Sequence, residues 1–272
     1  MTWRQQHFIQ SRFNLLLDIR SKACPTEESY QEWCIRRADL FLDITLPSVL
    51  NQSSGAFEWL IYFDVDRNPP VERVLAALAP HENIHPMFFD CRGRHPWDLV
   101  GHARIGVAER TSPGTEVVLT TKLDTDDALH HDFVRVLNHQ ARQLSREEIG
   151  NGLTINCDYG AQLVQGRFLA YLYGANPFLT LVEYARTPTG DALNFDLLKT
   201  AMTIQHYKVH EGLLVKHLLH KQPLWVQTIH EANAFNQAQD GLLELADPEA
   251  VAALFSITAT ALERTRRAQT GL

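Results

Sequence analysis

The fold is indicated by the stretch Val117–Leu129, which reads VVLTTKLDTDDAL. Its first part, Val117–Leu123, is an apolar run rich in β-branched residues and predicts a buried strand. Three carboxylates follow directly, Asp124, Asp126 and Asp127, and we expect a helix after them. In open α/β sheets ligands bind outside the carboxyl ends of the strands, so acids at this position favour a functional site.

Further strand candidates alternate with helical patterns on the N-terminal side of this stretch. The predicted strands are His7–Gln10, Glu58–Asp64 and Ile84–Asp90. The predicted helices are Glu28–Leu42, Val71–Ala79 and Trp97–Arg110. This alternation predicts an α/β fold with a mostly parallel sheet flanked by helices.

Beyond the acids, the pattern changes from crossover units to hairpins. A helix is predicted over His131–Glu147, and then strands over Leu153–Phe168 with a turn at Tyr159–Gly160. The last predicted helix, Pro248–Arg266, begins after Asp247, which suits an N-cap followed by proline at the first helical position. One loop, Thr187–Asp191, has strong turn chemistry and is expected to move.

Composition narrows the class of protein. The 272 residues carry 25 Lys+Arg against 32 Asp+Glu, a formal charge of −7, which argues against general nucleic-acid binding because phosphate backbones require a basic surface. No apolar run reaches the roughly 18 residues of a membrane span, and the N-terminus lacks a signal-peptide core. The four cysteines are scattered, so we expect reduced thiols and, without an export signal, a cytoplasmic, soluble protein. No repeat or Gly/Ser linker divides the chain, so we expect a single domain.

Three carboxylates within four residues repel one another unless a cation neutralises them. Hard oxygen ligands at this density suit Mg²⁺ or Mn²⁺, bound together with substrate phosphate oxygens. The alternative is a solvated turn with an aspartate N-cap.

The acid–x–acid pattern at the end of a central strand resembles the DxD motif of glycosyltransferases with the GT-A fold. An ordered set of further motifs over about residues 7 to 236 resembles the rhamnosyltransferase family within that fold. The segments that carry this resemblance are Arg12-Phe13-Asn14, then Trp33, Arg37 and Phe41, then Leu46–Gln52, Phe57–Leu60, Asp64, Leu123–Asp127, Asn176–Glu183 and Trp225–Asn233.

The resemblance implies a GT-A-like glycosyltransferase that moves a sugar, rhamnose by the family name, from a nucleotide-diphosphate donor to a glycan or small-molecule acceptor. It implies one domain over residues 1–272. Residues 1–130 would bind the nucleotide sugar, 131–240 would form a smaller antiparallel acceptor side, and 241–272 a C-terminal helix. Contact with a membrane surface is compatible with this activity, because glycans are often assembled there.

Carried over from the family pattern, Asp126 would bind Mn²⁺ or Mg²⁺ and Asp124 the donor, with Asp127 as a further ligand or as a residue that supports the ligands. His230 fits the position of a C-terminal histidine ligand; the alternative is a structural histidine. Lys122 stands where an arginine is expected before the acids, which keeps a cation for the donor phosphates and loses the bidentate geometry.

Four more residues are candidates on the same grounds. Arg12 and Asn14, just past the first strand, would contact the nucleotide, and Asp64 the base or ribose; helix capping or a turn is the alternative for each. Glu183 would be the base that deprotonates the acceptor hydroxyl, or else an exposed acid at the start of a helix.

Three other readings stay open. The spacing of His206, His210, His217 and His220 on one face of a helix could bind zinc, although no H-E-x-x-H motif is present. An aspartyl-nucleophile phosphohydrolase is a second possibility because Asp64 and Asp124 both follow strands. A non-catalytic nucleotide-sugar-binding module is the third.

Overall fold

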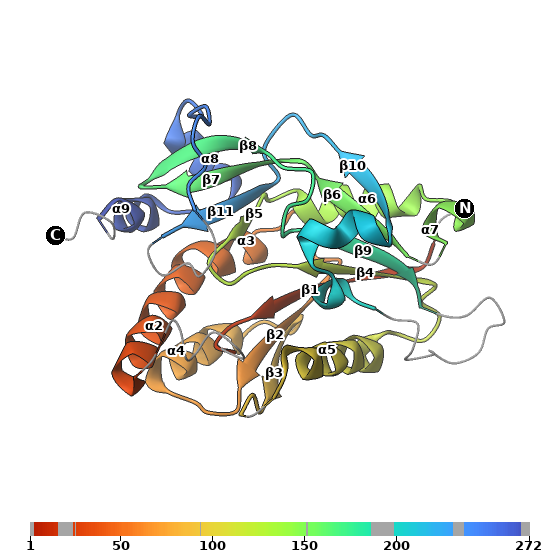
Figure 1. The fold of residues 1–272 in the computed structure, drawn as a ribbon, viewed down its shortest axis with the longest axis horizontal. Coiled ribbons are helices and arrows are strands. Elements are labelled where there is room, and N and C mark those ends of the chain that lie inside the picture. Colours follow the sequence, from red (N-terminus) through yellow and green to blue (C-terminus); the bar gives the residue numbers. More distant parts are fainter. Residues whose placement is uncertain are drawn as a thin grey trace.

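The computed structural model describes residues 3–15, 24, 26–92, 94–150, 152–185, 199–230 and 237–267. The predicted loop Thr187–Asp191 and the end of the Trp225–Asn233 motif after His230 lie outside these residues. The described chain forms two sheets with helices packed around them (Figure 1).

The larger sheet has seven strands in the order β10-β6-β9-β4-β1-β2-β3. Their bounds are β1 Gln5–Arg12, β2 Glu58–Asp64, β3 Ile84–Phe89, β4 Val117–Lys122, β6 Leu153–Cys157, β9 Thr180–Tyr184 and β10 Leu214–Leu218. Within this sheet β9 alone runs antiparallel to its neighbours. The other six strands therefore end at one side of the sheet, which we call the carboxyl edge.

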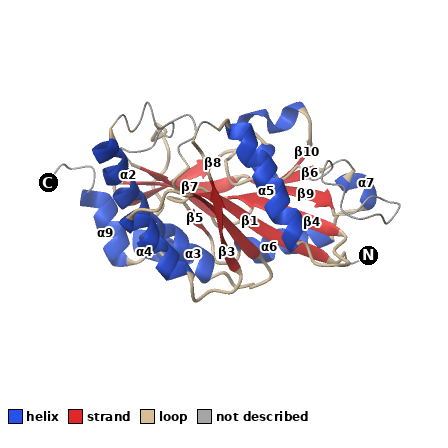
Figure 2. Cartoon of the chain, turned by 90° about the horizontal axis from the view of Figure 1, so that it is seen from below, coloured by secondary structure: helices blue, strands red, loops and turns tan. Residues whose placement is uncertain are grey.

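Side chains alternate between two buried faces of this sheet, as the strand period requires. Phe8, Leu60 and Val118 pack against α5 (Pro96–Arg110), which crosses one face (Figure 2). Ile9 and Trp59 face the opposite way, in a core shared with α4 (Pro69–Leu78) and α6 (Phe133–Arg142). The predicted mostly parallel sheet flanked by helices is confirmed.

The smaller sheet has the order β5-β11-β7-β8. Its strands are β5 Ala128–Leu129, β7 Tyr159–Val164, β8 Arg167–Leu172 and β11 Trp225–Ile229. It is mixed rather than antiparallel throughout, because β11 and β7 pair in parallel.

The hairpin turn was predicted at the wrong place. Gln165 and Gly166, with φ of 52° and 72°, form the turn between β7 and β8, since a tight hairpin turn needs positive φ at both central residues. Tyr159 and Gly160 lie inside β7 instead. A Cβ on Gly160 would stand 2.1 Å from the Trp225 ring, so close packing rather than a turn explains this glycine.

Three predicted helices are each divided. The first is α2 (Glu27–Leu40), which continues through the π-helical turn η1 (Phe41–Thr45) into α3 (Leu46–Leu50). The second separates into α6 and α7 (Arg146–Ile149), which Ser145 caps. The last separates into α8 (Pro248–Leu254) and α9 (Ala259–Arg267), because Ser256 has a left-handed φ of 57°. Asp247 caps α8 as predicted.

Among the described helices, none is both long enough and apolar enough to span a membrane.

Candidate functional site

The acidic segment connects the two sheets at the carboxyl edge. Leu123 donates its backbone N–H to Gln10 on β1, and the chain then turns, with Asp127 N bonded to Asp124 O at 3.3 Å. The next element is the short strand β5, and α6 starts only at Phe133. The helix expected directly after the acids is therefore wrong, and the acids lie between the two sheets.

Asp126 has two cationic or ionisable partners from distant parts of the chain. Its Oδ2 is 3.0 Å from His230 Nε2, at the end of β11, and 3.4 Å from Arg37 Nη1, on α2. Burial would raise the pKa of Asp126, but the Arg37 charge and the His230 hydrogen bond outweigh it and lower the pKa to about 2. Asp126 and His230, both predicted as metal ligands, are thus in contact, while the binding of a metal stays a prediction.

Arg37 is a site residue that the sequence reading left as a family motif position. Its Nε donates to Thr125 Oγ1 at 2.9 Å, so the guanidinium bonds two consecutive residues of the acidic segment. The Trp33 ring, one helical turn earlier, lies 5.1 Å from the guanidinium carbon and holds it by a cation–π contact. The i, i+4 spacing of Trp33 and Arg37 in the sequence could have indicated this contact, because such residues lie on one face of a helix.

Asp127 is buried and has a different role from Asp126. Its Oδ1 accepts the backbone N–H of Thr228 at 2.8 Å, which fixes β11 against the acidic segment. No described residue hydrogen-bonds Oδ2. Burial and the neighbouring charges of Asp126 and Asp124 raise the pKa of Asp127 well above its ordinary value.

The three acids do not converge as one ligand set. Among the described residues, Asp127 does not gather with Asp126 and His230 into a group whose ligand atoms lie close enough to share an ion. One Asp127 oxygen is bonded to the β11 backbone, so of the two predicted roles, direct ligand or support for the ligands, this arrangement favours the supporting role, which stays a prediction.

Basic side chains gather beside Asp124. Burial lowers the pKa of Lys122, an effect that the Asp124 charge opposes and the Arg12 charge adds to. The helix η3 (His206–Glu211) brings His206 near the same group, where burial and then the Lys122 charge lower its pKa. Arg12, Lys122 and Asp124 therefore lie close enough for their charges to interact, and His206 lies near Lys122 and Asp124, while the contact of these residues with a donor stays a prediction.

Asn14 and Asp64 link the ends of β1 and β2. Asp64 N donates to Asn14 Oδ1 at 2.8 Å, and Asn14 Nδ2 donates to the Tyr30 hydroxyl at 3.4 Å. Asp64 in turn accepts from Asp66 N and from the Cys91 thiol. Asn14 and Asp64, both predicted to contact the nucleotide sugar, lie at the carboxyl edge. The hydrogen bonds of Asn14, however, connect parts of the chain to one another and leave its side chain turned inward rather than toward a ligand.

Glu183 lies away from the acids. It pairs with Val118 on β4, four residues before Lys122, so about 13 Å of strand separates it from the carboxyl edge. The side chain is 4% exposed, and its two oxygens accept the backbone N–H groups of Lys199 and Thr200 at 2.8 and 3.1 Å. This placement does not fit the predicted catalytic base, and it makes Glu183 an anchor for the segment that leads to η3.

The four histidines considered for zinc do not share a helix face. His206 and His210 lie in η3, His217 lies on β10, and His220 follows that strand. A face shared by all four would require one continuous helix, and the chain changes to a strand between them.

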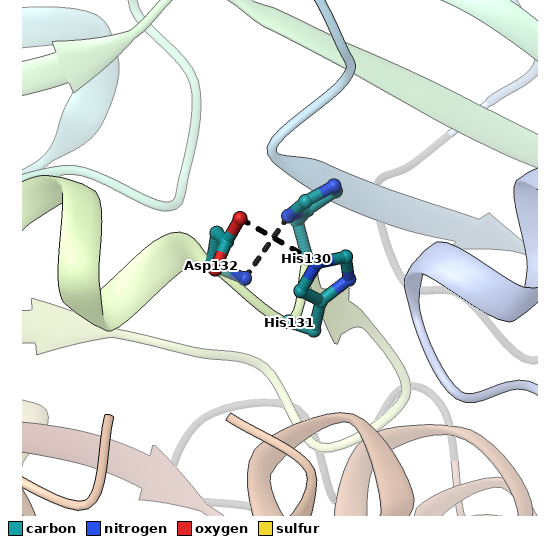
Figure 3. Close-up of side chains that lie close together, drawn as sticks. All are labelled: His130, His131 and Asp132. Carbon is teal, nitrogen blue, oxygen red and sulfur yellow. Dashed lines mark hydrogen bonds and ion pairs between the residues drawn. The ribbon is translucent and has the colours of Figure 1, made fainter. Parts of the chain in front are cut away.

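A second cluster, His130, His131 and Asp132, has its ligand atoms close together (Figure 3). His130 Nδ1 accepts the backbone N–H of Asp132 at 3.0 Å, and Asp132 bonds Ser53 Oγ and the Arg135 guanidinium. These contacts stabilise the start of α6, and the Arg135 guanidinium already neutralises the Asp132 carboxylate. We therefore interpret the cluster as structural.

A family model described as "Putative rhamnosyl transferase" matches residues 26–241. No curated protein matches the chain.

Among solved structures, a "putative nucleotide-diphospho-sugar transferase" from Desulfovibrio desulfuricans G20 has 12% identity over 80% of each chain, with a TM-score of 0.33. Mouse "Xyloside xylosyltransferase 1" has 7% identity over 79% of this chain and 85% of its own, with a TM-score of 0.36. The "WbbM bifunctional glycosytransferase" has 12% identity over 58% of this chain and 23% of its own, with a TM-score of 0.29.

Proposed function

Since the chain belongs to the "Putative rhamnosyl transferase" family, we propose that it transfers a sugar, in the first instance rhamnose, from a nucleotide-diphosphate donor to an acceptor hydroxyl with the help of Mn²⁺ or Mg²⁺. The observation that carries the proposal is the contact between Asp126 and His230, whose side chains come from segments 104 residues apart and meet at the carboxyl edge.

The residues present fit a divalent ion. Adjacent ligand atoms of an octahedral ion with bonds of about 2.1 Å lie about 3.0 Å apart, and Asp126 Oδ2 and His230 Nε2 are separated by 3.0 Å. Such ions are often held by one or two protein ligands plus substrate phosphates and water, so two ligands suffice. The ion would neutralise the diphosphate as it leaves.

The remaining residues of the site would act on the donor directly. Lys122 and Arg12 are basic groups beside Asp124, which suits a diphosphate group, and Asp124 can accept hydrogen bonds from sugar or ribose hydroxyls. Arg37 keeps Asp126 ionised and oriented through its bonds to Thr125 and Asp126. The excess of Asp and Glu in the chain is compatible with an anionic donor, because a divalent ion would lie between the carboxylates and the donor phosphates.

The proposal is tested with the variants Asp126→Asn and His230→Gln beside Glu82→Gln, an exposed acid before β3 at the other side of the sheet. The purified protein is screened against a panel of nucleotide sugars by thermal shift, with Mn²⁺, with Mg²⁺ and with EDTA. Ligand at a hundredfold excess over its Kd stabilises the folded protein by about 2.7 kcal/mol, which the shift detects.

We expect one donor to stabilise the wild type and Glu82→Gln only with metal, and both site variants to lose that stabilisation while keeping their fold. Transfer to a glycan or small acceptor is then followed with that donor. Equal stabilisation by the donor in EDTA would contradict the proposed metal dependence. The absence of any sugar transfer would contradict the proposed reaction.

A further inference from the structure

A second polar pair lies at the carboxyl edge, formed by Asp158, which follows β6, and His217 on β10. His217 Nδ1 is 2.9 and 3.0 Å from the two carboxylate oxygens of Asp158. The amide of Asn156, itself 1% exposed, donates to Asp158 Oδ1 at 2.6 Å and fixes the carboxylate.

The strand register places this pair level with the acidic segment. Thr180 on β9 pairs with both Thr121 and Ile155, so Asn156 is level with Lys122, and Asp158 with Asp124. His217 pairs with Asn156 and therefore shares that level and that face of the sheet. Strands are about 4.8 Å apart, which puts β6 about 10 Å and β10 about 14 Å from β4.

The helix η3 closes this gap from above the sheet. Its first residue, His206, lies near Lys122 and Asp124, and the His210 ring stacks on the His217 ring with centroids 5.7 Å apart at 17°. Four residues of 3₁₀-helix rise about 8 Å. The two ends of η3 therefore lie beside the basic group that we assign to the donor and beside the pair of Asp158 and His217.

The geometry fixes the protonation of the ring. A carboxylate on Nδ1 requires the proton on that nitrogen, so the neutral ring carries its lone pair on Nε2. Among the described residues none hydrogen-bonds Nε2, and the His217 side chain is 44% exposed, so a ligand can reach it. Gly174 lies at the ring edge, where a Cβ would be 3.3 Å from His217 Cε1, so no side chain from that position covers the ring.

We propose that His217, oriented by Asp158, is the catalytic base that activates the acceptor hydroxyl, a role that rests on the proposed sugar transfer. The acceptor oxygen gives its proton to His217 Nε2 and forms the new bond to the anomeric carbon. The bond from that carbon to the donor phosphate breaks, and the nucleoside diphosphate leaves with the electron pair. His217 then releases the proton to solvent. Attack with a separate base inverts the anomeric configuration.

The test compares His217→Gln, Asp158→Asn and His217→Gly with His139→Gln, a histidine on α6 outside both groups, in the full chain with the donor and acceptor found by the screen. A base contributes about 10²- to 10⁴-fold, so we expect that loss of kcat in His217→Gln, with KM and the donor-induced thermal shift retained. The acid limb of the wild-type kcat profile should disappear, and imidazole should restore part of the activity of His217→Gly. His139→Gln should match the wild type, and Asp158→Asn should fall between.

Product analysis by NMR adds an independent readout, with an inverted anomeric centre expected. Normal kcat or an unchanged pH profile in His217→Gln, no imidazole rescue, or a retained configuration would overturn the base and leave the transferase standing. If the wild type binds and turns over no nucleotide sugar, both proposals fall together.

Discussion

The contact between Arg37 and Asp126 gives the sharpest prediction, through the substitution Arg37→Met. Methionine keeps most of the aliphatic volume on α2 and removes the charge that faces Asp126. The two side chains are 17% and 7% exposed, so the pair is largely out of water. Removing Arg37 leaves a buried carboxylate without its guanidinium partner, while the contact with His230 stays.

The magnitude follows from the pKa of Asp126. It falls from 3.8 to about 2 in the folded chain, and a shift of this size is worth about 2 kcal/mol. Because the folded pKa lies below the unfolded one, this stability is present above about pH 4 and is lost as the pH falls toward 2. Without Arg37, burial dominates and the ionised carboxylate costs stability, so we expect a total loss near 3 kcal/mol at pH 7.

The assay is urea unfolding of the metal-free protein in EDTA at pH 7 and pH 4.5, with Arg36→Met, an exposed neighbour on the same helix, as the matched control. The deficit of Arg37→Met should narrow at the lower pH, where the unpaired Asp126 begins to protonate, and Arg36→Met should stay within about 0.5 kcal/mol. In an Asp126→Asn background, Arg37→Met should cost much less. A loss below 1 kcal/mol at pH 7, or the same loss in both backgrounds, refutes the reasoning.

Three more predictions concern neighbouring features. Glu183→Gln should lower the free energy of unfolding by about 1–3 kcal/mol, because the amide replaces one of the two accepting oxygens with an NH₂ group that cannot accept a backbone N–H. It should keep kcat within about threefold in the transfer assay, and a hundredfold loss would restore Glu183 as the base. Asp127→Asn should change the free energy of unfolding little in urea, because the raised pKa of Asp127 favours the neutral carboxyl, which an amide resembles. A loss of unfolding free energy above about 2 kcal/mol would contradict this. Gly160→Ala should cost about 2 kcal/mol or more in urea unfolding, because its Cβ would overlap the Trp225 ring, whereas Gly55→Ala, where no atom lies within 4 Å of the new Cβ, should be nearly neutral.

Much of the fold was predictable because strand signals are local. Glu58–Asp64 was predicted to the residue, and Val117–Leu123 to within one, since a buried strand is a short apolar run that needs no distant partner to be recognised. The placement of the acids at the carboxyl edge followed from the same signal, because parallel strands must end together. Helix ends were predicted less well, since Ser256 adopts a left-handed φ that its sequence neighbourhood does not announce.

The sequence by itself determined the α/β class, the acids after β4 and the resemblance that the family match confirms. Only the tertiary structure decided which of those acids meets which partner. Asp126 and Asp127 are consecutive, yet one bonds Arg37 and His230 and the other the backbone of Thr228, because successive side chains point in different directions. Register likewise separates Glu183 from the site and brings His217 level with Lys122, since pairing between distant strands fixes how far each one reaches toward the edge.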